Sequence, residues 1–215
     1  APGYYARADE VIAIAEEVGK RNKLYSTHQR DEGTISVGLF TSLNEAIETG
    51  RRAECKVQIS HVKCDFQKVW GKADKVLELI ENAVDEGLDV AGDQYPYPRS
   101  STGITGALFP RWSLSGGREE TLKIMVNEDS RPGLIDGINE IIDQGIGPEA
   151  VLIARYVPDE SLEGKNLAEI SDLMSMPPAE TVLSMYEKGD AMVIEYSMDE
   201  DDVDKFAKHP LIAVA

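Results

Sequence analysis

The first hundred residues alternate helix-forming and strand-forming segments three times, and this alternation limits the possible folds more than any other feature. Apolar side chains recur at helical spacing in residues 8–18, 41–50 and 72–87. A short run typical of a strand follows each helix, at residues 23–28, 55–61 and 88–97. Helices and strands that alternate in this way are typical of a parallel sheet with helices packed outside it, either open or closed into a barrel. The sequence therefore predicts an α/β fold.

Polar side chains recur at nearly equal intervals where these strands end. His28, His61 and Asp93 each lie at or near the C-terminal end of a predicted strand. In α/β enzymes the C-terminal ends of parallel strands meet at one edge of the sheet, where the chemistry takes place. We therefore expect the three side chains to converge, and two histidines that converge could share a metal ion.

The second half of the chain is less regular. Residues 101–120 are rich in Gly, Ser and Thr and predict a long loop. Further helices are predicted at 118–127, 132–143, 166–188 and 199–210, the third of them interrupted by Pro177 and Pro178. Strands are predicted at 149–158 and 191–198, and an apolar run follows at 211–215. The acidic residues 199–204 are interpreted as a solvated helix start, since the spacing of a calcium-binding loop is absent.

Composition excludes several classes of function. The chain carries a formal net charge of −17, which argues against a nucleic-acid surface because phosphate binding needs clustered cations. It has two cysteines, Cys55 and Cys64, in no pattern typical of a disulfide framework or a zinc knuckle. No apolar run is long enough to span a bilayer, so no membrane partner is expected and the cytoplasm is the default location.

Several short motifs resemble a known enzyme family. The segments THQRDE at 27–32, QISHVK at 58–63, DQYPY at 93–97 and LEGKNLAEI at 162–170 are similar, in order and spacing, to segments of the N-acyl-D-amino-acid deacylases. These enzymes are the D-aminoacylase branch of the amidohydrolase superfamily. The resemblance implies a metal-dependent (β/α)8 barrel, usually with zinc, that hydrolyses the amide bond of an N-acyl-D-amino acid.

The resemblance also implies a division of the chain. Residues 1–100 would form βα units of the amidohydrolase barrel, residues 101–148 a loop and helical insertion, and residues 149–215 the remaining barrel strands and helices. The chain would then be an internal or C-terminal fragment with about the last four barrel strands. Half a barrel exposes strand edges, so we expect the chain to associate with the rest of the barrel or with itself.

Site residues follow from the matching motifs. His28 and His61 resemble metal ligands of the family, while Tyr95 and Ser101 resemble positions that contact the substrate. Lys63 matches a lysine at the rim of the pocket. Asp93 resembles a structural carboxylate and is not assigned as the catalytic base.

The family's remaining metal ligands and its general base are not found in this sequence. The family's His-x-His pair and its metal-binding cysteine have no counterpart in the sequence, and its general-base aspartate is expected beyond Ala215. We therefore assign no catalytic residue and expect the fragment to be inactive alone. Two alternatives stay open: a cyclic amidohydrolase of the dihydroorotase or hydantoinase kind, and a non-catalytic binding or assembly module on the same scaffold.

Overall fold

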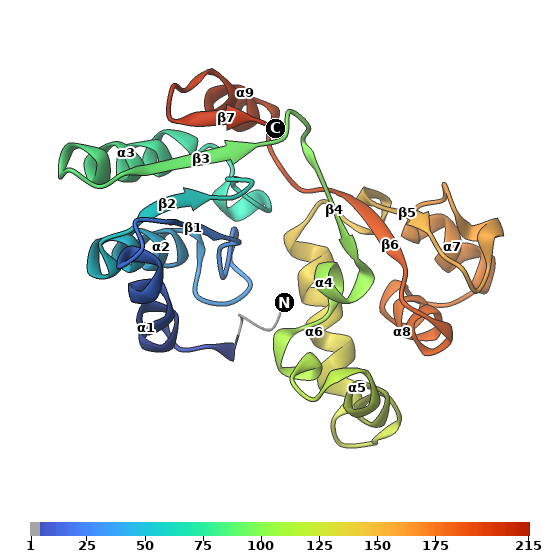
Figure 1. The fold of residues 1–215 in the computed structure, drawn as a ribbon. Helices are drawn as coiled ribbons and strands as arrows, with labels where there is room; N and C mark the ends of the chain where they lie inside the picture. The colour runs from blue at the N-terminus through green and yellow to red at the C-terminus, as the bar shows by residue number, and fades with distance from the viewer. Residues whose placement is uncertain (1–4) are drawn as a thin grey trace. The chain divides into compact units, whose positions relative to one another are not determined.

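The computed structural model describes residues 5–215, which divide into two compact units (Figure 1). Unit 1 contains the described residues up to Pro98 together with Met198–Ala215, and unit 2 contains Arg99–Ser197. The second unit is therefore an insertion in the sequence of the first. Within residues 5–215 no helix is both long enough and apolar enough to cross a membrane.

Unit 1 is built on a parallel sheet of four strands. The strands are β1 (Leu24–Thr27), β2 (Lys56–Ile59), β3 (Val90–Gln94) and β7 (Ile212–Val214), and they lie in that order (Figure 1). Each neighbouring pair is parallel, with Thr27 opposite Ile59 and Ile59 opposite Gly92. The predicted α/β class is confirmed, and the first three expected strands pair in sequence order.

Four helices pack beside this sheet in the same order as the strands. They are α1 (Ala8–Gly19), α2 (Leu39–Ala53), α3 (Ala73–Asp85) and α9 (Glu200–Lys208). Neighbouring helices contact each other, and each helix contacts the strand that follows it in the sequence. A short 3₁₀ turn, Gln67–Val69, precedes α3. Buried side chains of β2, such as Val57 and Ile59, meet Leu43, Ile80 and Phe206 of the helices. Burial of this apolar surface is what holds the helices to the sheet.

The opposite face of the sheet is polar, because side chains of a strand alternate between its two faces. Gln58 lies between the buried Val57 and Ile59 and donates to Asp93 Oδ2 over 2.7 Å. The hydroxyls of Ser26 and Ser60 lie 3.2 Å apart on the neighbouring strand pair. Polar side chains from three strands thus share one face of the sheet.

Helices α1 and α2 approach closely where both end, and a glycine allows this. A Cβ added to Gly19 would lie 1.8 Å from the carbonyl oxygen of Ala53. We expect the Gly19→Ala substitution to lower the free energy of unfolding by about 1–3 kcal/mol, because the backbone of α2 would have to move. Chemical denaturation followed by circular dichroism measures the change. Gly133→Ala is the control, since nothing lies within 4 Å of a Cβ there; equal stability of both variants would contradict the prediction.

Unit 2 is built on an antiparallel sheet with the strand order β4, β6, β5. The strands are β4 (Arg99–Gly103), β5 (Val151–Arg155) and β6 (Met192–Tyr196). Its helices are α4 (Ile104–Leu108), α5 (Gly117–Val126), α6 (Arg131–Gln144), α7 (Leu167–Met174) and α8 (Pro178–Lys188), with 3₁₀ turns at Arg111–Leu114, Pro148–Ala150 and Glu160–Leu162. Ile138, Ile153 and Val193 are fully buried in this unit.

Two strands expected to continue the barrel lie instead in unit 2. The predicted strands at 149–158 and 191–198 become β5 and β6, and they pair antiparallel with each other. The start of the predicted Gly, Ser and Thr loop becomes β4, which pairs with β6 from Arg99 opposite Tyr196 to Gly103 opposite Met192. Apolar runs identify a strand but not the sheet or the direction in which it pairs, so the sequence alone could not separate these strands from the parallel ones.

The acidic residues 199–204 require one correction. Asp202 is only 1% exposed, so the segment is not uniformly solvated. Its carboxylate accepts hydrogen bonds from the backbone N–H groups of Gly71, at 2.7 Å, and Ala73, at 3.1 Å. Gly71 lies just before α3 and Ala73 is its first residue, and the first N–H groups of a helix lack partners within it. Asp202 therefore fastens α9 to the start of α3.

Candidate functional site

The two histidines expected to bind metal lie together in unit 1. His28 directly follows β1 and His61 lies two residues after β2. Their ring centroids are 4.5 Å apart with an angle of 41° between the planes, and Nδ1 of His28 faces Nε2 of His61 in direct contact. Neighbouring parallel strands end at the same edge, and this brings together two residues that are far apart in the sequence.

Asp93 fixes the backbone that presents His61. His61 has a φ of +43°, a left-handed conformation that few residues other than glycine adopt. Its N–H donates to Asp93 Oδ1 over 2.7 Å, and the next N–H, of Val62, donates to the Asp93 carbonyl over 2.8 Å. The other carboxylate oxygen is held by Gln58. In this geometry Asp93 supports His61.

An ion pair between a buried lysine and a partly buried glutamate contacts the far side of the His61 ring. Glu32 Oε1 lies 2.8 Å from His61 Nδ1 and 2.6 Å from Lys63 Nζ. The side chain of Lys63 is 4% exposed and that of Glu32 is 18% exposed. The lysine expected at the rim of a pocket is thus buried, with its charge compensated by Glu32.

Glu32 is held in its ionised form. Burial on its own would raise the pKa of this carboxyl group, but the charge of Lys63 and the hydrogen bond from His61 outweigh that effect and keep the pKa below its ordinary value. A carboxylate, which can only accept hydrogen bonds, therefore faces both the lysine and the histidine.

The loop that carries Glu32 is tied down by its neighbours. Asp31 is 6% exposed and accepts hydrogen bonds from the N–H groups of Gly33 at 2.9 Å, Ser36 at 2.6 Å and Gly38 at 2.9 Å. Arg30 Nε donates to Glu45 of α2 over 2.8 Å. Charged residues after His28 thus form a loop of ion pairs and hydrogen bonds, which gives Glu32 a defined position.

The two predicted substrate contacts lie in different units. Tyr95 follows β3 in unit 1, and its ring centroid is 5.6 Å from Lys63 Nζ. Burial, together with the charges of Glu32 and Asp65, raises the pKa of Tyr95, so its hydroxyl stays protonated. Ser101 lies in β4 of unit 2, where it is exposed and pairs with Ile194. The structure therefore groups Tyr95 with the histidines and Lys63, while the role of Ser101 stays a prediction.

The donor atoms fit one part of a zinc site. Two imidazole nitrogens face each other, and a carboxylate contacts the other nitrogen of His61, as is usual for a metal-binding histidine. A hydrolytic zinc ion takes about three protein ligands and a water molecule. Among residues 5–215 no group of three or more His, Cys, Asp and Glu side chains is arranged to hold a metal. The name half-site is used below for the pair His28 and His61, whose binding of a metal stays a prediction.

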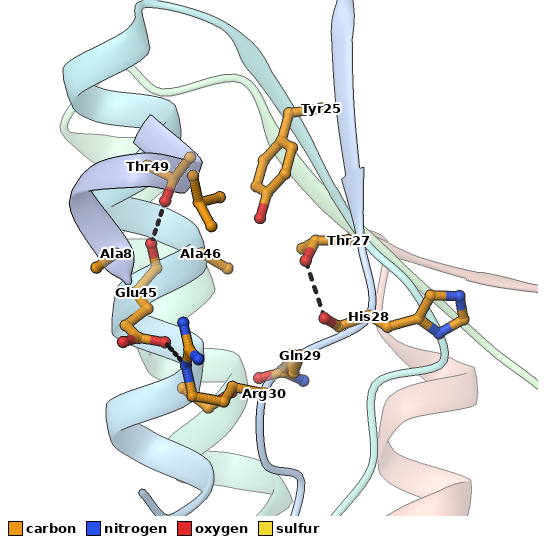
Figure 2. A pocket seen from close by; sticks show the side chains of 11 residues that line it. Ala8, Tyr25, Thr27, His28, Gln29, Arg30, Glu45, Ala46 and Thr49 are labelled. Carbon is orange, nitrogen blue, oxygen red and sulfur yellow. Dashed lines mark hydrogen bonds and ion pairs between the residues drawn. The ribbon is translucent and has the colours of Figure 1, made fainter. Parts of the chain in front are cut away.

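A pocket of about 280 Å³ lies on the other side of β1 from the half-site. Figure 2 shows the imidazole of His28 pointing away from this pocket, while its carbonyl accepts a hydrogen bond from Thr27 Oγ1 at 3.0 Å. The amide of Gln29 is buried here and has no hydrogen-bond partner within the described part of the chain. The lining residues come from α1, β1, the loop after it and α2: Ala8, Val11, Tyr25, Thr27, His28, Gln29, Arg30, Ser42, Glu45, Ala46 and Thr49.

Sequence reasoning missed the part that Glu32 plays. Glu32 entered it only as the last residue of the THQRDE motif, without a connection to His61 or Lys63. The available signal was weak, namely a carboxylate four residues after one predicted ligand and a lysine two residues after the other. Their contact depends on how the two loops fold over the strand ends, which spacing alone does not reveal.

Comparison with known proteins supports the deacylase resemblance. The chain is 38% identical over 101 residues to an N-acyl-D-glutamate deacylase and 36% identical over 101 residues to a D-aminoacylase, both from Alcaligenes xylosoxydans xylosoxydans. Each alignment covers 47% of this chain and 20% of the relative. No family profile matches the chain.

Solved structures share the fold. The N-acyl-D-glutamate deacylase of Bordetella bronchiseptica, in complex with zinc and a phosphonate inhibitor that mimics the tetrahedral intermediate, aligns with a TM-score of 0.73 at 24% identity. A D-aminoacylase with a binuclear metal centre aligns with a TM-score of 0.71 at 23% identity. Both alignments cover 98% of this chain and 35% of the other.

These comparisons confirm the resemblance that the motifs predicted. The chain is homologous to N-acyl-D-glutamate deacylase and D-aminoacylase over about half of its length, and nearly all of it follows the fold of such enzymes. The matched region spans about a fifth of the curated relatives and about a third of the solved structures.

Proposed function

We propose that this chain, a homologue of the N-acyl-D-amino-acid deacylases, supplies two metal ligands and part of the substrate pocket of an enzyme that hydrolyses N-acyl-D-amino acids. The observation that carries the proposal is the half-site: His28 Nδ1 and His61 Nε2 face each other where two neighbouring parallel strands end. The four parallel strands would be barrel strands, and a longer polypeptide would supply the other ligands and the general base.

The chain's own residues would hold and orient the metal. His28 and His61 would bind zinc or another divalent ion, with Asp93 fixing the His61 backbone and Glu32 the His61 ring. When bound, zinc lowers the pKa of a water molecule to about 7, so that hydroxide is available at neutral pH. Tyr95 follows β3 at the same edge of the sheet as the two histidines, so its side chain would be available to the substrate of such a site.

Substrate contacts would come from Lys63, Tyr95 and Ser101. Tyr95 keeps its proton and can donate a hydrogen bond to a carbonyl or carboxylate oxygen of the substrate. Lys63 Nζ lies 5.6 Å from the Tyr95 ring centroid, and its ammonium group has three donors, so it would contact a substrate oxygen while it stays paired with Glu32. The carboxylate of an N-acyl-D-amino acid fits both groups.

Zinc binding tests the proposal. We expect the chain to bind zinc stoichiometrically in calorimetry, and the His28→Ala and His61→Ala substitutions to weaken binding by more than about 100-fold. Loss of a residue that only orients a ligand already costs about 10- to 100-fold, so loss of a ligand costs more. Hydrolysis of N-acetyl-D-glutamate is assayed on the same samples, and turnover by the chain alone would show that it needs no further ligand.

His209→Ala is the matched control, because this histidine also lies in unit 1 but pairs with Glu81 at 3.0 Å. The zinc affinity of the His209→Ala variant should equal that of the unchanged chain. If the chain binds no zinc, or if both site variants bind it unchanged, the half-site proposal is wrong and a non-catalytic binding module becomes the better interpretation.

A further inference from the structure

A carboxylate oxygen and an ammonium nitrogen both lie within hydrogen-bond distance of the same ring nitrogen of His61. His61 Nδ1, Glu32 Oε1 and Lys63 Nζ form a small triangle with sides of 2.8, 2.6 and 2.7 Å. Nδ1 of a neutral imidazole either carries the proton or accepts one from a neighbour. It therefore can donate to Glu32 or accept from Lys63, but it cannot do both.

The two arrangements have opposite effects on the metal half-site. If Nδ1 donates to Glu32, Nε2 has a free lone pair that faces His28 Nδ1. If Nδ1 accepts from Lys63, the proton of the neutral ring lies on Nε2 and occupies the position where a metal would bind. The tautomer of His61 thus decides whether the half-site is ready for a metal.

We propose that Glu32 is a positioning residue that keeps His61 in the Nδ1–H tautomer. Its carboxylate accepts the hydrogen bond of that N–H and also one from the Lys63 ammonium group, so that Lys63, although 2.7 Å from the same nitrogen, donates to Glu32 and not to the ring. One carboxylate oxygen, Oε1, accepts both hydrogen bonds. The use of the tautomer for metal binding rests on the proposed function, whereas the tautomer itself is a property of the metal-free chain.

The surroundings of Glu32 allow it to act in this way. Asp31 is fastened by three backbone N–H groups and Arg30 by Glu45, so the residues before Glu32 are fixed. Lys63 is almost fully buried, and Glu32 is the carboxylate that contacts its ammonium group. Removal of the charge on Glu32 would free Lys63 to donate to His61.

The Glu32→Gln substitution tests this inference with two readouts. The first is the ¹⁵N chemical shifts of the His61 ring in the metal-free chain, at a pH where the ring is neutral. We expect Nδ1–H in the unchanged chain and a shift of the population toward Nε2–H in the variant. The second is zinc affinity by calorimetry, which should fall about 10- to 100-fold.

Glu48→Gln is the matched control, because Glu48 lies in the same unit and pairs with Arg51 in an exposed ion pair on α2. It should change neither readout. Nδ1–H at full population in the Glu32→Gln variant would overturn the inference. Absence of zinc binding by the unchanged chain would contradict the proposed function instead, and the ring shifts would still decide the role of Glu32.

Lys63→Met gives an independent test if the Glu32→Gln variant does not fold. This substitution removes the competing donor and leaves Glu32 as the partner of Nδ1. We expect the Nδ1–H tautomer to persist. A change to Nε2–H in this variant would show that Glu32 does not determine the tautomer, and would overturn the inference.

Discussion

Replacement of Phe206 by alanine is expected to lower the free energy of unfolding of unit 1 by about 3–5 kcal/mol. Phe206 is fully buried on α9 and belongs to the core formed by α2, α3 and the parallel sheet. The helix α9 leads directly into β7, a strand of three residues at the edge of that sheet. Loss of the ring would leave a cavity and loosen both elements, since α9 packs against β7.

The fluorescence of Trp70 allows the stability of unit 1 to be measured separately from that of unit 2. The sequence has two tryptophans, Trp70 in unit 1 and Trp112 in unit 2, so a Trp112→Phe background leaves one fluorophore in unit 1. Denaturant titration in that background gives the change for Phe206→Ala. Lys208→Ala is the control, because this exposed side chain on the same helix should change stability by about 0.5 kcal/mol or less. A loss below about 1 kcal/mol for Phe206→Ala would show that α9 does not form part of the core.

The Glu32→Leu substitution is expected to have a similarly large effect, about 3–5 kcal/mol. Lys63 would then be a buried ammonium group without its carboxylate, and such an uncompensated charge is costly because the low-polarity interior solvates it poorly. The same fluorescence titration measures the change in the free energy of unfolding. Glu48→Leu breaks an ion pair with Arg51 whose side chains are 47% and 42% exposed, and should cost at most about 1 kcal/mol.

A second substitution separates the charge from the packing of Glu32. In the double variant Glu32→Leu with Lys63→Met no buried charge remains unpaired, so we expect most of the lost stability to return. If the double variant is as unstable as the single one, the cost does not arise from the unpaired lysine and the explanation is wrong.

Much of unit 1 could be predicted from its sequence. The helical periodicity and the strand runs of the first hundred residues gave three of the four parallel strands in the right order. The nearly equal intervals between His28, His61 and Asp93 indicated that these residues converge, and they do, with His28 and His61 in contact and the Asp93 carboxylate bonded to the His61 N–H. Local periodicity worked here because each strand pairs with the next one in the sequence.

Unit 2 and the partners of the site could not be predicted in the same way. The strand β4 has the sequence RSSTG, which is typical of a loop, and it becomes a strand because it pairs with Val193 and Ile194 of a segment far along the chain. The contact of Glu32 with Lys63 likewise joins two loops. Local patterns contain no information about such distant partners.

The two chain connections between the units lie side by side in unit 1, and this affects which parts of the sequence can vary in length. The chain leaves unit 1 after Pro98 and returns at Met198, whose N–H donates to the Pro98 carbonyl over 3.3 Å. Arg99, which follows Pro98, is paired in the antiparallel sheet with Tyr196, two residues before Met198. Since departure and return lie side by side, residues 99–197 could be lengthened, shortened or exchanged for another segment while β3 and α9 keep their places. Evolution can therefore vary this segment separately from the histidine pair.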